Sequence, residues 1–336
     1  MSPKFERIDA FNLDEAPLLF PVGWDKKYYR LGSKDFHFSK RSLDLTSQLN
    51  IQENILYAGR VRLEGAIEPG RLQIAFVESE ELRLIGASID NCIMTVAYDN
   101  ACWEAVANMK GRGLTINIHA NLSAKLFSPE DLEALKQAMS GIHGKNAIIS
   151  PMFPIAQTTK KAAQECLDTF ENYDLLGNHA SDPTILPWEP EEIMELCVNI
   201  IEEVVKKDFI QATLGEMQRR QLARAVEEYL WQDPSKLLHK DFSLDFFANK
   251  LGASRRTIQT AVKEVFGIGF VELKRLIRLQ QIRYNLLLKK DHLSVLTLAQ
   301  SYAVGHFGRF AKDYRDLFGE LPSQTNKKIT QQSNLF

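Results

Sequence analysis

Five polar residues near the C-terminal end of the chain can bind nucleic acid if they share one helical face. They are Arg255, Arg256, Gln259, Thr260 and Lys263. Apolar residues fill the positions between them at helical spacing, which places the polar side chains on the opposite side of the helix. Arginine pairs with guanine edges, glutamine with adenine edges, and lysine with phosphate. This set therefore predicts a helix that enters the major groove of double-stranded DNA.

A helix-turn-helix pattern surrounds this polar face. Ser243 can cap a first helix over residues 244–251, Gly252 and Ala253 form a turn, and Ser254 can cap the second helix. The residues expected to pack the two helices together are Leu244, Phe247, Ala248, Leu251, Ile258, Ala261, Val262, Val265 and Phe266.

A second helix-turn-helix pattern spans residues 298–322. Its predicted inner residues are Leu298, Ala299, Tyr302, Phe307, Phe310, Tyr314, Leu317 and Phe318. Arg309, Lys312 and Arg315 occupy polar positions, and Arg315 is expected to contact phosphate. The intervening helix, residues 270–289, would be about 28–30 Å long. That length suits two recognition helices about one DNA turn, ~34 Å, apart.

The charge of the chain is unevenly distributed. Residues 214–336 contain 20 Lys and Arg against 12 Asp and Glu, a net charge of +8, whereas the other residues contain 21 against 31, a net of −10. A basic segment beside an acidic remainder favours a polyanionic partner for the C-terminal part alone.

Residues 219–325 resemble the DNA-binding region of the AraC/XylS family of transcription regulators. The resemblance is carried by Ala248-x5-Ser254-x3-Ile258, Gly267, Arg278-Leu279, Ala299, and Phe310-x-Lys-x-Tyr314-Arg315-x3-Gly319-x2-Pro322. Within the family, Arg255–Gln259 and Gly267–Gly269 are most similar to the ethanolamine-operon regulators.

The resemblance also implies which positions read bases. In the first recognition helix these are Arg256, Gln259 and Thr260. In the second, Phe307, Gly308 and Lys312 match the family's base-reading positions. Two of these lack a polar side chain, and Ala303-Val304 stand where the family carries a glycine-aromatic pair. The second unit is therefore expected to contact phosphate rather than bases.

The resemblance further implies an α+β chain of three parts. Residues 1–150 would form a β-barrel, cupin-like sensor domain, residues 151–212 a helical linker and dimerisation region, and residues 213–336 an all-α domain with two helix-turn-helix units. The implied partners are promoter DNA, RNA polymerase, a small-molecule effector and a second copy of the chain, and the implied action is activation.

Alternating apolar and polar residues independently predict strands between residues 35 and 120. The predicted strands are 36–38, 42–46, 72–77, 82–85, 93–98 and 114–118. Turn residues separate them, so a run of short antiparallel strands in a sandwich or barrel is expected. Ser128 and Pro129 mark the start of a helix.

The following segment changes to a helical pattern. Residues 141–144 and the segment from Pro151 to Pro154 are expected to be a connector, followed by helices over 159–173 and 191–207. Ile193, Cys197, Ile200 and Val204 form a short apolar seam on the second of these helices. The seam is shorter than a coiled coil needs, so it fits either packing within the chain or a dimer contact.

No pattern of the sequence indicates an enzyme or a bound cofactor. His37 and His119 do not form the paired-histidine motif of a metal cupin, and the four cysteines lack zinc-site spacing. The cysteines are expected to be small buried residues. A sensor pocket is the preferred interpretation of the strand-rich region, with His37, Arg60, Arg62 and Trp103 as candidate effector contacts. The alternative is a solid domain used for protein contact.

The N-terminal residues show no secretory signal, and no run approaches the ~18 apolar residues of a membrane helix. A cytoplasmic location, with no membrane partner, is therefore expected. Two other functions remain open: a protein-interaction scaffold that binds no DNA, and a DNA-binding regulator that needs no ligand.

Overall fold

The computed structural model describes residues 3–11, 26–79, 82–84, 87–89, 92–107, 111–141, 144–145, 147–175, 185–206, 214–232, 242–288, 294–302 and 304–326. The chain divides into two compact units. The first comprises Met1–Tyr28, Phe36–Ala58 and Leu63–Gln211, and the second comprises Tyr29–Asp35, Gly59–Arg62 and Ala212–Phe336.

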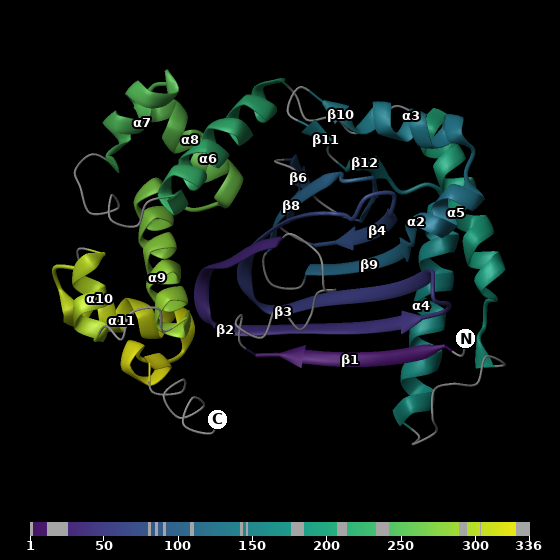
Figure 1. The fold of residues 1–336 in the computed structure, drawn as a ribbon, viewed down its shortest axis with the longest axis horizontal. Coiled ribbons are helices and arrows are strands. Elements are labelled where there is room, and N and C mark those ends of the chain that lie inside the picture. Colours follow the sequence, from purple (N-terminus) through teal and green to yellow (C-terminus); the bar gives the residue numbers. More distant parts are fainter. Residues whose placement is uncertain are drawn as a thin grey trace. The chain divides into compact units, whose positions relative to one another are not determined.

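An antiparallel sheet forms most of the first unit (Figure 1). Its strands are β1 (Lys4–Ala10), β2 (Lys26–Asp44), β3 (Leu49–Ala66), β4 (Leu72–Glu78), β5 (Leu82–Leu84), β6 (Ala87–Ile89), β7 (Ile93–Tyr98), β8 (Cys102–Ala107), β9 (Gly111–Ile118) and β12 (Ile148–Pro151). Among the described residues the strand order is β12-β7-β4-β9-β3-β8-β5-β6, an open path, and β2 pairs with both β1 and β3.

Alternating side chains of the central strands build the core of the first unit. Ile74 on β4 lies opposite Val96 on β7 and Ile116 on β9, and all three are fully buried. Burying such aliphatic side chains contributes roughly 1.5–3 kcal/mol each. The predicted α+β fold, with a sheet-rich N-terminal part and a helical C-terminal part, is confirmed.

The expectation of a connector at residues 141–144 and 151–154 is partly wrong, because this part of the chain contains short strands. It contains β10 (Ser140–Gly141), paired with β11 (Gly144–Lys145), and the strand β12, which joins the main sheet beside β7. Ile148 and Ile149 are buried there. A four-residue strand that ends at a proline is too short for its alternation to stand out in the sequence.

In the described part of the first unit the helices are α2 (Ala120–Leu126), α3 (Pro129–Met139), α4 (Pro154–Leu175) and α5 (Pro190–Lys206). Ser128 caps α3 by accepting a hydrogen bond from the Asp131 amide, as predicted. The apolar seam of α5 is at most 1% exposed, and α5 packs against α3 and α4. The structure therefore favours the intramolecular alternative for this seam.

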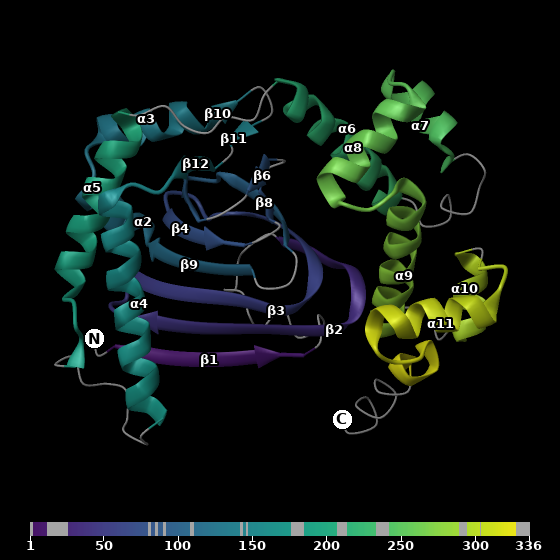
Figure 2. The same ribbon diagram turned by 180° about the vertical axis from the view of Figure 1, so that it is seen from behind.

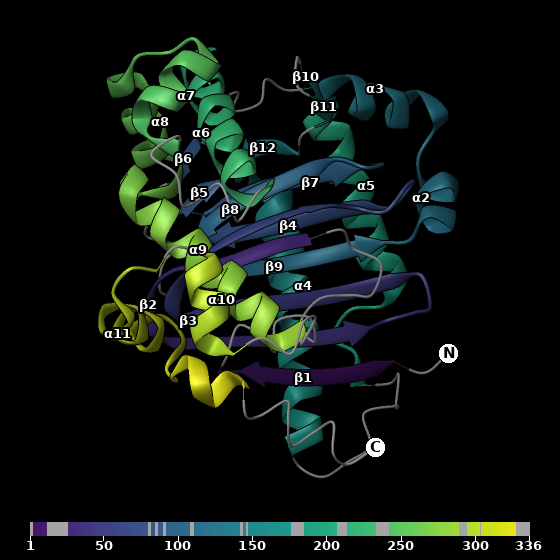
Figure 3. The ribbon, with the colours of Figure 1, turned by 60° about the vertical axis from the view of Figure 1, so that its left-hand side comes forward.

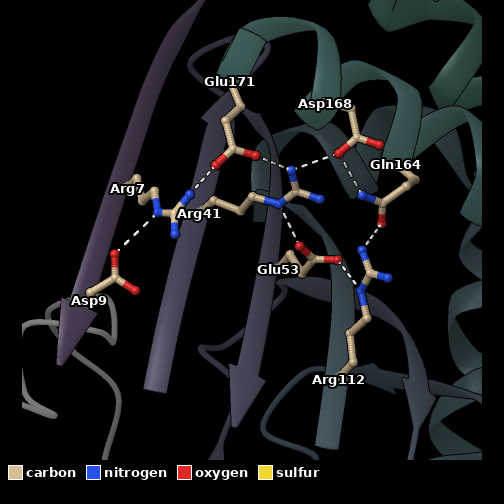
Figure 4. Close-up of polar contacts among 8 residues, drawn as sticks. All are labelled: Arg7, Asp9, Arg41, Glu53, Arg112, Gln164, Asp168 and Glu171. Atoms are coloured by element: carbon tan, nitrogen blue, oxygen red, sulfur yellow. Dashed lines mark hydrogen bonds and ion pairs between the residues drawn. The ribbon is translucent and has the colours of Figure 1, made fainter. Parts of the chain in front are cut away.

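A network of charged side chains holds α4 on the sheet (Figures 2 and 4). Glu53 on β3 is fully buried between Arg41 of β2, at 2.5 Å, and Arg112 of β9. Arg41 also reaches Asp168 at 2.7 Å and Glu171 at 2.6 Å, both on α4. Each charge has an opposite partner, which is the condition for burying such groups. The network is therefore structural.

The helices of the second unit are α6 (Leu214–Gln232), α7 (Leu244–Leu251), α8 (Arg255–Phe266), α9 (Phe270–Leu288), α10 (Val295–Ser301) and α11 (Phe307–Phe318). In Figure 3, α9 runs from the group that contains α6, α7 and α8 to the group that contains α10 and α11. Phe247, Phe266, Leu273 and Ile277 are fully buried in this unit. No described helix is long and apolar enough to span a membrane.

Two strand segments, Tyr29–Asp35 and Gly59–Arg62, are grouped with these helices. The Arg62 guanidinium lies 3.4 Å from the Glu227 carboxylate of α6 and 5.7 Å from the centre of the Phe266 ring. Tyr29 donates to the other Glu227 oxygen, at 2.5 Å. Arg62 is only 1% exposed, so this ion pair is part of the core of the second unit.

Candidate nucleic-acid interface

The first helix-turn-helix unit has the predicted caps and turn. Ser243 accepts a hydrogen bond from the Phe246 amide at 3.2 Å, and Ser254 accepts one from the Thr257 amide at 3.0 Å. Gly252 ends α7 in the left-handed conformation, at φ 63°. A side chain is disfavoured in that conformation, which explains why glycine makes this turn.

Helix α8 has one buried face and one exposed polar face. Ile258, Ala261 and Val262 are fully buried. Every predicted DNA-contacting residue on this helix is exposed: Arg255, Arg256, Gln259, Thr260 and Lys263. The helix therefore brings these five side chains together on one surface, and the buried face fixes their direction by packing against α6 and α7.

Two residues of the polar face already have protein partners. Arg255 forms an ion pair with Asp245 in the first turn of α7, and both side chains are more than half exposed. Lys263 donates to the Gly267 carbonyl at 3.0 Å, at the end of its own helix. Exposed pairs of this kind contribute little to stability, so both cations can exchange these partners for phosphate.

The second helix-turn-helix unit repeats the division into two faces. Phe310, Tyr314, Leu317 and Phe318 are buried on α11, whereas Phe307, predicted to face inward, is half-buried. The candidate contacts Arg309, Lys312 and Arg315 are exposed. The substituted turn residue Ala303 lies outside the described residues.

A buried polar cluster that the sequence did not indicate fixes α11 to α9. Arg283 is 3% exposed and lies 2.9 Å from Glu320, 3.2 Å from the Tyr314 hydroxyl and 3.2 Å from the Thr325 hydroxyl. Burial raises the pKa of Tyr314 to about 12, so its hydroxyl keeps its proton. The only local signal was an arginine on the apolar side of a helix, and its partners come from 31 to 42 residues away.

The four candidate effector contacts have separate surroundings. In the first unit, the His37 ring stacks between Phe11 and Tyr57, and its Nε2 lies 3.2 Å from Asp9. Trp103 packs over Gly65, where a Cβ would lie 3.1 Å from the ring.

Arg60 and Arg62 belong to the second unit. Arg60 Nη1 lies 3.5 Å from the Gly267 carbonyl oxygen, and Arg62 has the Glu227 and Phe266 contacts described above. The structure therefore gives each of the four candidates its own protein neighbours.

The cysteines only partly match the prediction that they are small buried residues. Cys166 and Cys197 are buried, but Cys92 is half-buried and Cys102 is exposed. Cys102 is the first residue of strand β8. In the described part of the chain, no group of three His, Cys, Asp or Glu side chains is placed to hold a metal ion.

Comparison with known proteins bears on the C-terminal part of the chain. A family described as a helix-turn-helix domain matches residues 247–328. A probable AraC family transcriptional regulator from Rhodopseudomonas palustris CGA009 is 29% identical, over 32% of this chain and 96% of its own length, with a TM-score of 0.29.

Two further structures resemble the chain. The C-terminal domain of AraT, a response regulator from Geobacillus stearothermophilus, is 21% identical over 32% of this chain and 84% of its own, with a TM-score of 0.28. ToxT from Vibrio cholerae, whose structures include one with a bound unsaturated fatty acid, is 10% identical. The alignment with one ToxT structure covers 90% of this chain and 97% of the ToxT chain, with a TM-score of 0.26. The C-terminal part of the chain is a helix-turn-helix domain.

Proposed function

We propose that the chain is a sequence-specific DNA-binding transcription regulator. The observation that carries this proposal is the exposed face of α8, where basic and amide side chains stand together above a buried apolar face. A helix of about 18 Å with such a face fits a major groove. The matching helix-turn-helix family over residues 247–328 supports it.

The exposed residues divide between two roles. Arg256, Gln259 and Thr260 read base edges: Arg256 and Gln259 can make bidentate contacts, and the Thr260 hydroxyl can make a single one. Arg255 and Lys263 flank them and contact phosphate.

On α11, Arg309, Lys312 and Arg315 also contact phosphate. Gly308 offers no side-chain donor, and the half-buried Phe307 offers none either. The second unit therefore adds affinity and fixes register rather than reading sequence.

The first unit, in this proposal, senses a small molecule and makes the protein an activator that recruits RNA polymerase in the cytoplasm. The sensor proposal is supported by the excess of acidic residues in the N-terminal part of the chain and by the antiparallel sheet of this unit. Of the predicted effector contacts, His37 and Trp103 belong to this unit, whereas Arg60 and Arg62 belong to the second unit, where Arg62 is buried in an ion pair. The His37 side chain is 33% exposed, and its ring neighbours Phe11 and Tyr57 are exposed as well, so a ligand can reach it. The ethanolamine-operon resemblance and a homodimer remain predictions.

Selection of binding sites from random duplexes by the full-length chain tests the proposal. A regulator enriches one sequence motif, and the complex with that motif survives excess competitor DNA. A scaffold that binds no DNA enriches no motif and gives no salt-sensitive complex. Repeating the measurement with candidate metabolites tests sensing: identical DNA affinity and transcription with every metabolite favours a ligand-independent regulator.

A further inference from the structure

A groove lies between the start of α7 and the first half of α9, within the second unit. Its volume is about 440 Å³, and its described lining residues are Phe242, Ser243, Leu244, Phe270, Val271, Lys274, Arg275 and Arg278. Phe242 and Phe270 form a buried floor, whereas Val271 is 78% exposed at the rim. The groove is thus apolar at its base and open to solvent.

Positive charge gathers along the α9 side of this groove. Lys274, Arg275 and Arg278 belong to its lining, and the described lining residues include no carboxylate. Arg275 is paired with Glu272 at 3.4 Å and with Asp313 at 3.1 Å, both outside the lining. Lys274 donates to the Phe242 carbonyl at 3.2 Å. Burial and the nearby charge of Arg278 lower the pKa of Lys274. An anion in the groove would relieve this repulsion, so the groove is complementary to negative charge.

Ion pairs connect both sides of this groove to the two recognition helices. On the α7 side, Asp245 follows the lining residue Leu244 and pairs with Arg255 of α8. On the α9 side, Arg275 lies 3.1 Å from Asp313 of α11, which lies 4.0 Å from Arg309. Residues in or beside the groove are therefore linked by ion pairs to both recognition helices.

We propose that this groove seats the sugar-phosphate strand that passes between two successive major grooves. This inference rests on the proposed DNA-binding function. When two helices enter major grooves one turn apart, the surface between them faces the minor groove and its flanking phosphates. Lys274 and Arg275 bind the phosphates, and Val271 packs against the deoxyribose. Contacts of this kind fix position and carry no sequence information.

Val271 allows a charge test that leaves the core intact, because its side chain is exposed. Val271→Asp places a negative charge at the rim, and Val271→Asn is a neutral control of nearly equal size. Binding is measured with the full-length chain on its selected site and on a random duplex, over a range of salt. Val271→Asp should bind both duplexes about fivefold more weakly than Val271→Asn at low salt, from one repulsion at ~4 Å in water. The difference should shrink as salt increases.

Lys274 gives a second, independent readout. Lys274→Gln should make the slope of log affinity against log salt less steep by about 0.9, because one phosphate contact is lost. The ratio of its affinities for the selected site and for a random duplex should stay unchanged. Lys274→Arg should restore the slope. Lys161→Gln, at a lysine of α4 in the first unit whose side chain is 74% exposed, controls for the change in net charge and should leave the slope unchanged. Thermal unfolding checks that each variant is folded.

Three outcomes would overturn the inference. If folded Val271→Asp and Lys274→Gln bound DNA with the affinity and the salt dependence of the wild type, the groove proposal would be wrong. The proposed DNA-binding function would still stand. Unchanged DNA binding with lost transcription would instead assign the groove to an acidic segment of a protein partner. Absence of any sequence-specific binding by the wild-type chain would remove the proposed function and the groove proposal together.

Discussion

Arg256 and Gln259 project from the exposed face of α8 about one helical turn apart, whereas Lys263 lies at the end of the helix beside Gly267. A side chain that reads bases contributes only on the correct sequence. A side chain that binds phosphate contributes on every sequence. Substitution can therefore separate the two roles.

Arg256→Ala and Gln259→Ala should each cost ~1–3 kcal/mol on the preferred site and relax the preference at one base position. Lys263→Ala should weaken binding to preferred and random duplexes by the same factor. Titration of both duplexes at fixed salt measures the difference. Equal losses on the two duplexes for Arg256→Ala would place that arginine on phosphate.

The cysteines should differ in reactivity because they differ in burial. Burial raises the pKa of the Cys166 and Cys197 thiols to about 12, while Cys102 is exposed. Only the thiolate reacts, so a raised pKa removes reactivity below that pH. At pH 8 a maleimide should label Cys102 in the native protein, and Cys166 and Cys197 only after unfolding in urea. Peptide mass spectrometry identifies the sites, with Cys102→Ser as the control; fast native labelling of Cys197 would contradict its burial.

At the scale of elements, glycine has opposite roles in the two helix-turn-helix units. Gly252 adopts φ 63° in the α7–α8 turn, whereas Gly308 lies inside α11, and a Cβ at either position meets open space. Backbone conformation alone therefore decides the effect of an added methyl group.

Gly252→Ala should destabilise the protein by ~1 kcal/mol or more, because the left-handed conformation disfavours a side chain. Gly308→Ala should stabilise it by roughly 0.5–1 kcal/mol and leave the DNA sequence preference unchanged. Urea unfolding and site selection measure the two effects. A position-specific loss of preference in Gly308→Ala would show that α11 approaches the bases closely at this position.

Helix α5 allows a test of the intramolecular packing of its seam. Ile200 is fully buried, and Asn199 beside it is exposed. Ile200→Asp should destabilise the first unit by at least the ~2–5 kcal/mol of a large-to-alanine core substitution, because it also buries a charge. Asn199→Asp adds the same charge at the surface and should have little effect.

Sedimentation then distinguishes this packing from a dimer contact. Folded Ile200→Asp should have the same mass as Asn199→Asp and the wild type. A wild-type dimer that dissociates in Ile200→Asp, with an unchanged free energy of unfolding, would instead identify the seam as a subunit interface.

The sequence predicted those elements whose caps and apolar spacing lie within a few neighbouring residues. The caps at Ser243 and Ser254 and the two faces of α8 follow from neighbouring residues, so the local geometry of this helix-turn-helix unit was predicted from the sequence. Strand β3 was missed, since Glu53 and Arg62 interrupt its apolar alternation. Both are buried only because distant partners neutralise them.

The groove was missed for a similar reason. Phe242 and Lys274 are 32 residues apart and meet only when α7 and α9 pack together. No spacing within either segment marks them as one site. Contacts of this range depend on tertiary packing, which periodicity does not report.

At the scale of the whole molecule, a net charge of −2 conceals a basic C-terminal part. Its positive side chains lie on α8, α11 and the groove of α9, where a polyanion can contact all three. Each phosphate that the protein neutralises releases bound counterions. Specific binding should therefore combine a base-dependent part, from α8, with a salt-dependent part shared by all three surfaces.

The most direct test of this account is selection of sites by the full-length chain from random duplexes, followed by titration of the selected site at several salt concentrations. The account predicts one enriched motif whose complex resists competitor DNA. It also predicts that log affinity falls linearly with log salt, with a slope of about −0.9 per phosphate contact. An unenriched pool, or affinity for the enriched duplex no greater than for a random one, would contradict the central claim that α8 reads DNA sequence.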